Sequence, residues 1–263
     1  MKLTSMKSTA KMLLAALLFQ LGIAVVHAAP VDARAAHGKT ALYVYNRTKL
    51  EGARVANPID PKRVATLETW RRNDTAAMTA LKALGFAIRE ADEHAGLDGD
   101  KDIDLIVVSE SVDAIEVGTK YRTVAIPMVV MENDLLPDLG MTDQKSGRDY
   151  GTDDNQRFLW VVNSPHPLAA GLTAGVQNVL ADEHFKMNWG KPGLGAITIA
   201  TLRGEPDKAA IFAYEKGATM NGEALAPARR VSLFIWQDVF ENLRPEGQAL
   251  FRAAALWAVS TPE

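Results

Sequence analysis

The chain has 263 residues, with 29 Lys and Arg against 32 Asp and Glu, and it contains no cysteine. The lack of cysteine excludes disulfides, zinc–thiolate sites and cysteine nucleophiles within this sequence. A formal net charge of −3 offers no basic footprint, so we expect no nucleic-acid partner.

The first 28 residues have the pattern of a secretory signal peptide. Lysines precede an apolar stretch from Met12 to Val26, and the stretch ends in a small-residue cleavage site at Ala28. Cleavage after Ala28 removes three lysines and no acid, so the charge of −3 becomes −6. We therefore expect a periplasmic or secreted protein. No later stretch is apolar enough to span a membrane, so we expect no stable membrane insertion after cleavage.

We expect a flexible, alanine-rich leader at residues 29–40 and a single α/β domain at residues 41–263. The first half of that domain alternates strands with helices. Its predicted strands are 41–46, 86–92, 102–111 and 124–132, and its predicted helices are 64–84 and 112–122. This alternation predicts parallel strands joined by right-handed crossovers, in a doubly wound, flavodoxin-like, mostly parallel sheet.

The second half of the domain is predicted to contain extra β-structure. A polar stretch at 142–157 indicates a loop, and strands are predicted at 158–163, 176–180, 195–202, 209–215 and 229–236. The chain closes with a predicted helix at 244–260, where Pro245 is tolerated in the first turn.

Polar residues end three of the predicted parallel strands, namely Glu110, Glu132 and Asn163. Ligand crevices in such sheets lie at the carboxyl ends of the strands, so we expect all three side chains, with neighbouring Asn133, to face one crevice. A buried strand that ends in glutamate is costly unless the carboxyl is paired or faces a cleft. Glu110 and Glu132 could share a proton, bind a cation or act as an acid/base pair. Helix capping and structural hydrogen bonding remain the alternatives.

Further candidate site residues follow in the second half. His166 lies between two prolines, and Asp182, Glu183 and His184 form a cluster of groups for acid/base chemistry or ligand binding. With His166 and a glutamate, this cluster could build a divalent-metal site, although no tight ligand spacing is present. Trp160, Trp189, Tyr214 and Trp236 could stack on a sugar ring, and Trp189, in a Gly/Pro-rich segment, is predicted to be the most exposed of them.

Three segments of the chain, taken together and in their order along the sequence, resemble the class I glutamine-amidotransferase-like superfamily. Within that superfamily they resemble the ThuA-like (trehalose-utilisation) branch. The segment IPMVVMEN (126–133) looks like the proline-led strand that feeds the nucleophile turn. The segment 163–184 contains His-Pro, then Gly-Leu, then Asp-Glu, as in ThuA-like proteins. The segment 228–259 resembles the closing strand, loop and helix of the family, ending in Trp257-Ala258.

The resemblance implies an amidotransferase-like fold, but the cysteine of active amidotransferases would fall near Glu132. A carboxylate cannot replace that thiolate in glutamine hydrolysis, so glutaminase activity is not expected. Two functions remain open. The first is a binding or accessory protein for a carbohydrate or another polar small molecule. The second is a hydrolase or isomerase that uses carboxylates and histidine, with or without a divalent metal, on a sugar-like substrate.

Overall fold

The computed structural model describes residues 32–97 and 102–261. The expected signal peptide and the start of the expected leader lie outside these residues. The second half of the leader forms a short 3-10 helix, η1 (Ala33–Ala36), in which Ala36 is buried in the main core, so this part packs against the domain. Within the described residues, no helix is both long and apolar enough to cross a membrane.

The described strands form one mixed sheet with the order β2-β1-β3-β4-β11-β10-β9-β6-β7, and β5 and β8 pair beside this path. Strands β2, β1, β3, β4 and β11 are parallel. Their bounds are β1 (Thr40–Tyr45), β2 (Ala87–Asp92), β3 (Leu105–Val108), β4 (Met128–Val130) and β11 (Arg230–Ser232). The short strands LIVV and MVV are buried at every position, as continuous apolar runs are in a covered parallel sheet.

The other strands pair antiparallel. Their bounds are β5 (Tyr150–Gln156), β6 (Phe158–Val161), β7 (Gly175–Asn178), β8 (Phe185–Gly190), β9 (Ile197–Leu202) and β10 (Glu205–Tyr214). Strand β5 falls inside the segment expected to be a loop, and β8 was not expected. Strand β5 (YGTDDNQ) is almost entirely polar, which is why periodicity missed it, whereas β8 (FKMNWG) alternates apolar and polar residues and was overlooked beside the Gly/Pro-rich stretch that follows it.

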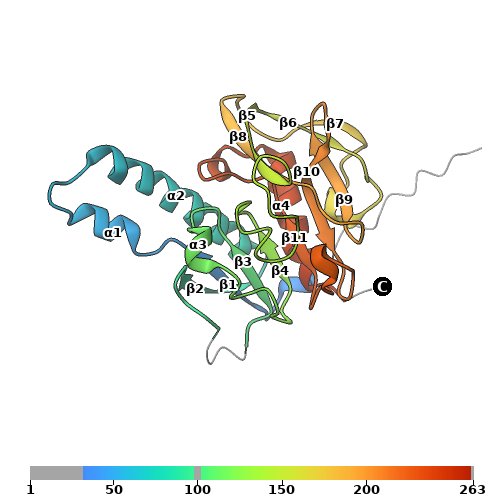
Figure 1. The fold of residues 1–263 in the computed structure, drawn as a ribbon, viewed down its shortest axis with the longest axis horizontal. Coiled ribbons are helices and arrows are strands. Elements are labelled where there is room, and N and C mark those ends of the chain that lie inside the picture. Colours follow the sequence, from blue (N-terminus) through green and yellow to red (C-terminus); the bar gives the residue numbers. More distant parts are fainter. Residues whose placement is uncertain (1–31, 98–101, 262–263) are drawn as a thin grey trace, which may run out of the picture.

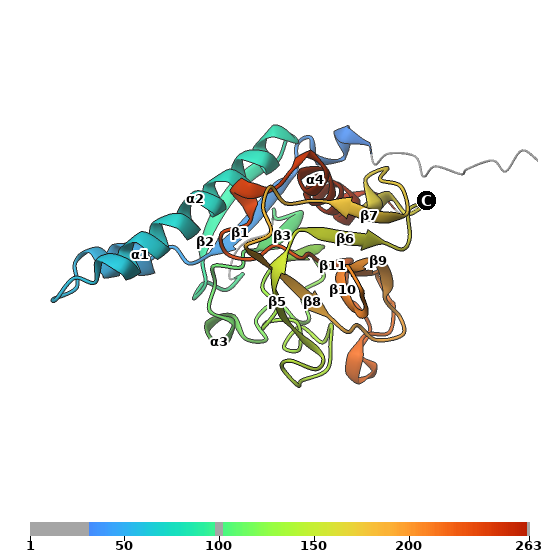
Figure 2. The ribbon, with the colours of Figure 1, turned by 90° about the horizontal axis from the view of Figure 1, so that it is seen from above.

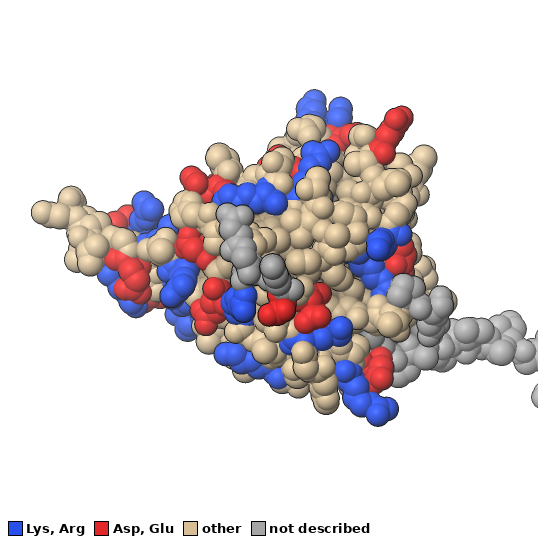
Figure 3. All heavy atoms as spheres, turned by 90° about the horizontal axis from the view of Figure 1, so that it is seen from below, with Lys and Arg blue, Asp and Glu red and all other residues tan. Residues whose placement is uncertain are grey.

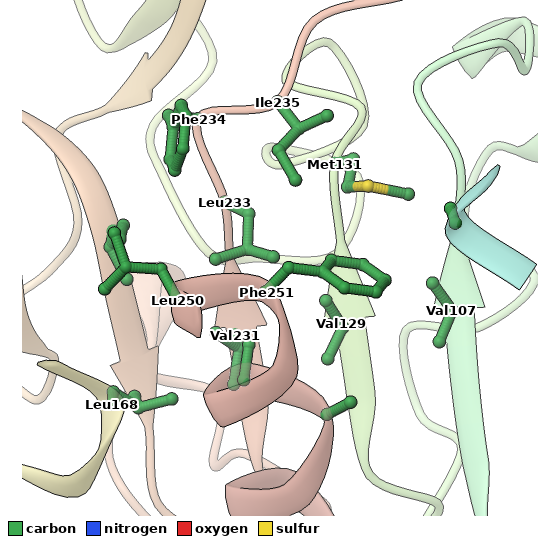
Figure 4. Close-up of a cluster of buried hydrophobic side chains, with 14 of the residues drawn as sticks. Val107, Val129, Met131, Leu168, Val231, Leu233, Phe234, Ile235, Leu250 and Phe251 are labelled. Carbon is green, nitrogen blue, oxygen red and sulfur yellow. The ribbon is translucent and has the colours of Figure 1, made fainter. Parts of the chain in front are cut away.

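Helices α2 (Pro61–Ala83) and α4 (Pro245–Val259) cover one face of the sheet (Figure 2). Figure 4 shows Leu250 and Phe251 of α4 packed over side chains of β3, β4 and β11. The opposite face is covered by the four-residue α3 (Ala114–Val117) and by loop residues such as Tyr121 and Leu136. The fold is therefore an α/β sheet, but the doubly wound arrangement is not confirmed, because one face carries loops in place of long helices.

Helix α2 begins where the sequence places a capping residue: Asp60 accepts hydrogen bonds from the backbone N–H groups of Lys62 and Arg63. Its first turns project from the sheet beside the short α1 (Lys49–Arg54), forming an arm at one side of the molecule (Figures 1 and 2). Seen from below, the surface has acidic and basic side chains interspersed (Figure 3).

Candidate functional site

A cleft of about 530 Å³ opens beside the carboxyl ends of β3 and β4. Residues after these strands form its inner wall, α3 and the start of α1 form one side, and the segments around Tyr150 and Trp236 form the other. The lining residues are Lys49, Trp70, Glu110, Ser111, Val112, Asp113, Ala114, Ile115, Glu132, Asp134, Asp138, Ser146, Tyr150, Trp236 and Gln237.

Glu110 and Glu132 lie at equivalent positions on the two neighbouring strands. Val108 of β3 pairs with Val130 of β4, and each glutamate follows two residues later. The alternation of side chains along extended backbone therefore places both on the same side. Glu110 is 2% exposed and Glu132 is 6% exposed, so both carboxyls are buried although they line the cleft.

The two carboxyls differ in their hydrogen bonds. Glu132 accepts a hydrogen bond on Oε1 from the backbone N–H of Asp134, at 2.8 Å. Neither carboxyl oxygen of Glu110 has a hydrogen-bond partner among the described residues. Buried polar groups are nearly always paired, so an unpaired carboxyl at the wall of a cleft requires an explanation in terms of what enters the cleft.

Burial raises the pKa of both groups. The pKa of Glu132 rises to about 8, because desolvation outweighs the hydrogen bond from Asp134. Desolvation also raises the pKa of Glu110 well above its ordinary value, and the nearby charge of Glu132 raises it further. Near neutral pH, Glu132 is therefore largely protonated, and the pair holds protons that ordinary surface glutamates have lost.

A second buried carboxyl centre lies behind Glu110. Asp74 of α2 accepts hydrogen bonds from the hydroxyls of Tyr43, Ser109 and Ser111, the last at 2.9 Å. Burial raises the pKa of Asp74 to about 6, against the lowering effect of these hydrogen bonds. Asp74, Ser109 and Glu110 also line a small inner cavity of about 10 Å³, which is the size of a single water molecule.

The rim of the cleft combines acidic and aromatic side chains. Among the described residues of the lining, Lys49 alone is cationic, and it is held by the fully buried Glu93 at 3.1 Å and by Asp113 at 3.7 Å. Trp70, Tyr150 and Trp236 are half-buried in the wall. The cleft therefore offers two buried carboxyl groups at depth, that of Glu110 unpaired, and aromatic rings nearer to solvent.

The structure does not bring Asn163 and His166 to this cleft. Strand β6 pairs antiparallel with β9, and β9 with β10, so β6 runs opposite to the parallel strands and ends at the other edge of the sheet. The His166 ring lies 5.4 Å from the Trp257 ring, and its Nδ1 accepts the backbone N–H of Leu168 at 3.2 Å. Burial lowers the pKa of His166. The expected position of His166 in the crevice is therefore wrong.

The cluster at 182–184 is also outside the cleft. Asp182 accepts the backbone N–H of His184 at 2.8 Å, and the cluster is exposed to solvent. Within residues 32–97 and 102–261, no group of three or more His, Asp or Glu side chains is arranged to hold a metal ion. The expected grouping of His166, His184 and a glutamate around one metal does not form, because these residues lie on separate parts of the sheet.

Two further expectations are corrected by burial. Trp189 is 3% exposed and donates its indole N–H to Asp153 at 3.0 Å, so it is a core residue, while Trp160 is 46% exposed. Asn133 is buried and donates its amide to Asp134 at 3.0 Å, but it does not line the cleft. Asn133 therefore holds Asp134 of the acidic wall in place without lining the cleft itself.

Sequence reasoning missed Asp74, Trp70 and Asp134 as parts of the site. Asp74 had a detectable signal: it lies seven residues after Leu67 and four before Met78, on the apolar face of the predicted helix. An acid on that face needs partners inside the protein. Trp70 had no such signal, because its spacing fits a core position equally well.

Comparisons with known proteins find similarity in structure alone. No family model matches the sequence, and no curated protein matches it either. A structure from Bacteroides uniformis, provisionally named ThuA-like, is 13% identical with a TM-score of 0.48, covering 85% of this chain and 92% of its own. One from Thermoplasma acidophilum, provisionally named as part of GMP synthase, is 12% identical with a TM-score of 0.44, covering 85% and 95%. These likenesses assign no residue role and no activity to this chain.

Proposed function

We propose that the cleft beside Glu110 and Glu132 binds a polar small molecule of about the size of a sugar, in an exported ThuA-like domain without glutaminase activity. The observation that carries the proposal is the unpaired carboxyl of Glu110 in the cleft wall. Hydroxyl or amino groups of a ligand would supply the missing donors. Binding sites of this size commonly place a few polar groups among apolar walls.

The lining also limits the chemistry of the ligand. Five carboxyl residues face one lysine, and that lysine is already engaged by Glu93 and Asp113. A phosphate or carboxylate ligand would meet charges of its own sign in a poorly solvated wall. The aromatic rings of Trp70, Tyr150 and Trp236 provide flat apolar surfaces on which a sugar ring can stack. The proposed ligand is therefore a carbohydrate or another polyhydroxylated compound without negative charge.

Thermal unfolding of the mature protein tests this proposal. The scan uses a panel of neutral sugars, polyols, amino sugars and sugar phosphates, with wild type beside Glu110→Gln. A ligand at 100 times its dissociation constant should stabilise the fold by about 2.7 kcal/mol. We expect neutral or amino compounds to raise the midpoint in wild type, and the sugar phosphates to have no effect.

The matched control is Glu205→Gln, because Glu205 is an exposed glutamate at the start of β10, away from the cleft lining. It should retain the full ligand response, while Glu110→Gln should lose most of it. The proposal fails if no neutral or cationic member of the panel stabilises wild type, or if the two variants respond alike.

The pKa of Glu132 favours a second function, an acid/base enzyme on a sugar-like substrate. A carboxyl with a pKa of about 8 is protonated at neutral pH and can protonate a leaving group. Such an activity would fall as pH rises through about 8, and Glu132→Gln would abolish it. Hydrolysis of nitrophenyl glycosides across pH 5–9 tests this. If a ligand binds but no glycoside is hydrolysed, the enzyme function is contradicted and the binding function stands.

Export remains part of the proposal. It rests on the N-terminal sequence, where lysines, an apolar stretch and a small-residue site follow one another. To test export, the full chain is expressed in a bacterium and the mass of the protein in the periplasmic fraction is measured. The expected product is a mature chain that begins at Ala29. The acidic cleft and the net charge also support a small-molecule ligand over a nucleic acid.

A further inference from the structure

We propose that the ligand of this cleft carries a positive charge, as a primary or quaternary ammonium group, and that Glu110 and Glu132 bind this group between the aromatic rings of the wall. This inference rests on the proposed function, because it names the class of ligand for the same cleft. It separates cationic compounds, such as amino-polyols, from the neutral sugars that the shape and polarity of the cleft would also admit.

The first support is the sign of the charges that act on the two glutamates. The groups that raise the pKa of Glu110 through their charge are Glu132, Asp134, Asp238 and Asp74. Those that raise the pKa of Glu132 are Asp134 and Asp113. These acids come from α2, the N-cap of α3 and the segments after β4 and β11, so acidic residues of four separate parts of the chain act on the two glutamates. A bound cation would supply the counter-charge.

The second support is independent of charge. Glu110 is 2% exposed, and both of its carboxyl oxygens lack a hydrogen-bond partner among the described residues. Two other buried carboxyl groups have partners: Asp74 accepts from three hydroxyls, and Glu93 pairs with Lys49 and accepts the backbone N–H of Asp113. A primary ammonium group has only donors, and its charge-assisted hydrogen bonds to a carboxylate are about twice as strong as neutral ones, whereas a quaternary ammonium group has no N–H and interacts with the carboxylate through charge alone.

The third support is the aromatic wall. Trp70, Tyr150 and Trp236 line the same cleft as the two glutamates. Cations are attracted to the faces of such rings, as Lys186 shows by placing its Nζ 5.3 Å from the centre of the Trp236 ring. Sites for quaternary and primary ammonium groups combine aromatic faces with carboxylates in this way. A neutral polyol uses the rings but leaves the negative charge of the wall unbalanced.

Matched pairs of ligands, differing in charge at one position, test the inference. The first pair is 1-amino-1-deoxysorbitol and sorbitol, and the second is choline and its uncharged isostere 3,3-dimethyl-1-butanol. Titration calorimetry at pH 7.5 compares each pair on the mature protein. We expect at least one cation to bind with an affinity ~10-fold or more above that of its neutral partner.

Proton release supplies a second readout. A cation favours the ionised form of Glu110 and Glu132, so its binding should release protons, while a neutral ligand should release almost none. Calorimetry in two buffers with different ionisation enthalpies measures this number directly. Cation affinity should also rise between pH 6.5 and 8.5, because Glu132, whose pKa is about 8, loses its proton in that range.

The variants are chosen so that a folding defect does not hide the result. Glu110→Gln should weaken cation binding by ~10-fold or more and sorbitol binding by far less. Asp134→Asn and Asp138→Asn, at less buried positions of the wall, should each weaken cation binding a few-fold without affecting the fold. Glu205→Gln should bind as wild type does.

The outcomes separate this inference from the proposed function. If sorbitol or the butanol binds as tightly as its charged partner, or if cation binding releases no proton, the inference is overturned while the proposed binding function stands. If no member of either pair binds and no sugar stabilises the protein, both are overturned. Preferential cation binding that is lost in Glu110→Gln supports both.

Discussion

Buried charged side chains have different hydrogen-bond partners at the two edges of the parallel sheet. At the amino edge, Arg229 binds Glu215 through two hydrogen bonds and donates to the carbonyls of Trp257 and Ser260 at the end of α4. The neighbouring Arg230 is 0% exposed and donates to the carbonyls of Val124 and Ile126. At the carboxyl edge, by contrast, the buried Glu110 has no hydrogen-bond partner within the part of the chain that the structure describes.

The difference shows which buried charges serve the fold. The hydrogen bonds of the two arginines connect β11 with the segment before β4 and with the last turn of α4. Glu110 and Glu132 connect nothing comparable, and desolvation raises the pKa of both. A buried charge that is hydrogen-bonded to other segments indicates structure, whereas one that is unpaired beside a cleft indicates a ligand site.

Substitution of Arg229 by methionine should have the largest effect on stability. The change leaves Glu215 and the carbonyls of Trp257 and Ser260 without their donor, so the free energy of unfolding should fall by about 3–5 kcal/mol. Urea unfolding followed by circular dichroism measures this. Arg252→Met, at an exposed position of α4, is the control and should change the value by less than ~0.5 kcal/mol. A loss below ~1 kcal/mol in Arg229→Met would remove the contrast between the edges.

Burial of Glu132 should make the free energy of unfolding fall as pH rises. Its folded-state pKa of about 8 lies above the ordinary value of 4.5, so the folded state holds a proton that the unfolded state has lost. Stability from this group is complete below pH 4.5, declines between there and pH 8, and is lost above. We expect wild type to lose about 2–3 kcal/mol relative to Glu132→Gln between pH 5 and 9. Parallel curves for the two proteins would show that Glu132 ionises normally.

Asp74→Asn tests the carboxyl centre that supports Glu110 from behind. An amide offers one acceptor oxygen to the hydroxyls of Tyr43, Ser109 and Ser111, where the carboxylate offers two. The free energy of unfolding at pH 7.5 should fall by about 1–2 kcal/mol. Asp207→Asn serves as the control, because its side chain is 84% exposed. If Asp74→Asn and Asp207→Asn are equally stable, the hydroxyls of Tyr43, Ser109 and Ser111 have found other partners without a loss of stability, which contradicts the prediction.

His166→Asn should have the smallest effect. Asparagine can still accept the backbone N–H of Leu168, and the loss is confined to the contact with Trp257, worth about 0.5–1 kcal/mol. Ligand binding in the cleft should be unchanged, because His166 lies at the opposite edge of the sheet. A large loss of ligand affinity in this variant would show that His166 acts on the binding site and would contradict its placement at the opposite edge of the sheet.

The sequence predicted the local part of this site and missed the long-range part. Glu110 and Glu132 were found because each follows a continuous apolar run, and the helix predicted at 64–84, which the structure has at 61–83, was found from its apolar spacing and its Gly85 stop. Asn163 was placed wrongly, because nothing within 158–163 reveals that this strand runs antiparallel to its neighbour. Trp189 was placed in a loop because Gly190, Pro192 and Gly193 follow it, although the alternation of apolar and polar residues in FKMNWG fits the strand β8.

What the sequence determined by itself is therefore the chemistry that each segment can bring: no thiol, two glutamates at strand ends, and strands short and apolar enough to be covered on both faces. What the tertiary structure decided is which of these groups meet. The register of β3 with β4 places Glu110 beside Glu132, and α2 brings Asp74 and Trp70 to them. Strand order and direction arise from pairing between residues far apart in the chain, and local periodicity is the same for a parallel and an antiparallel strand.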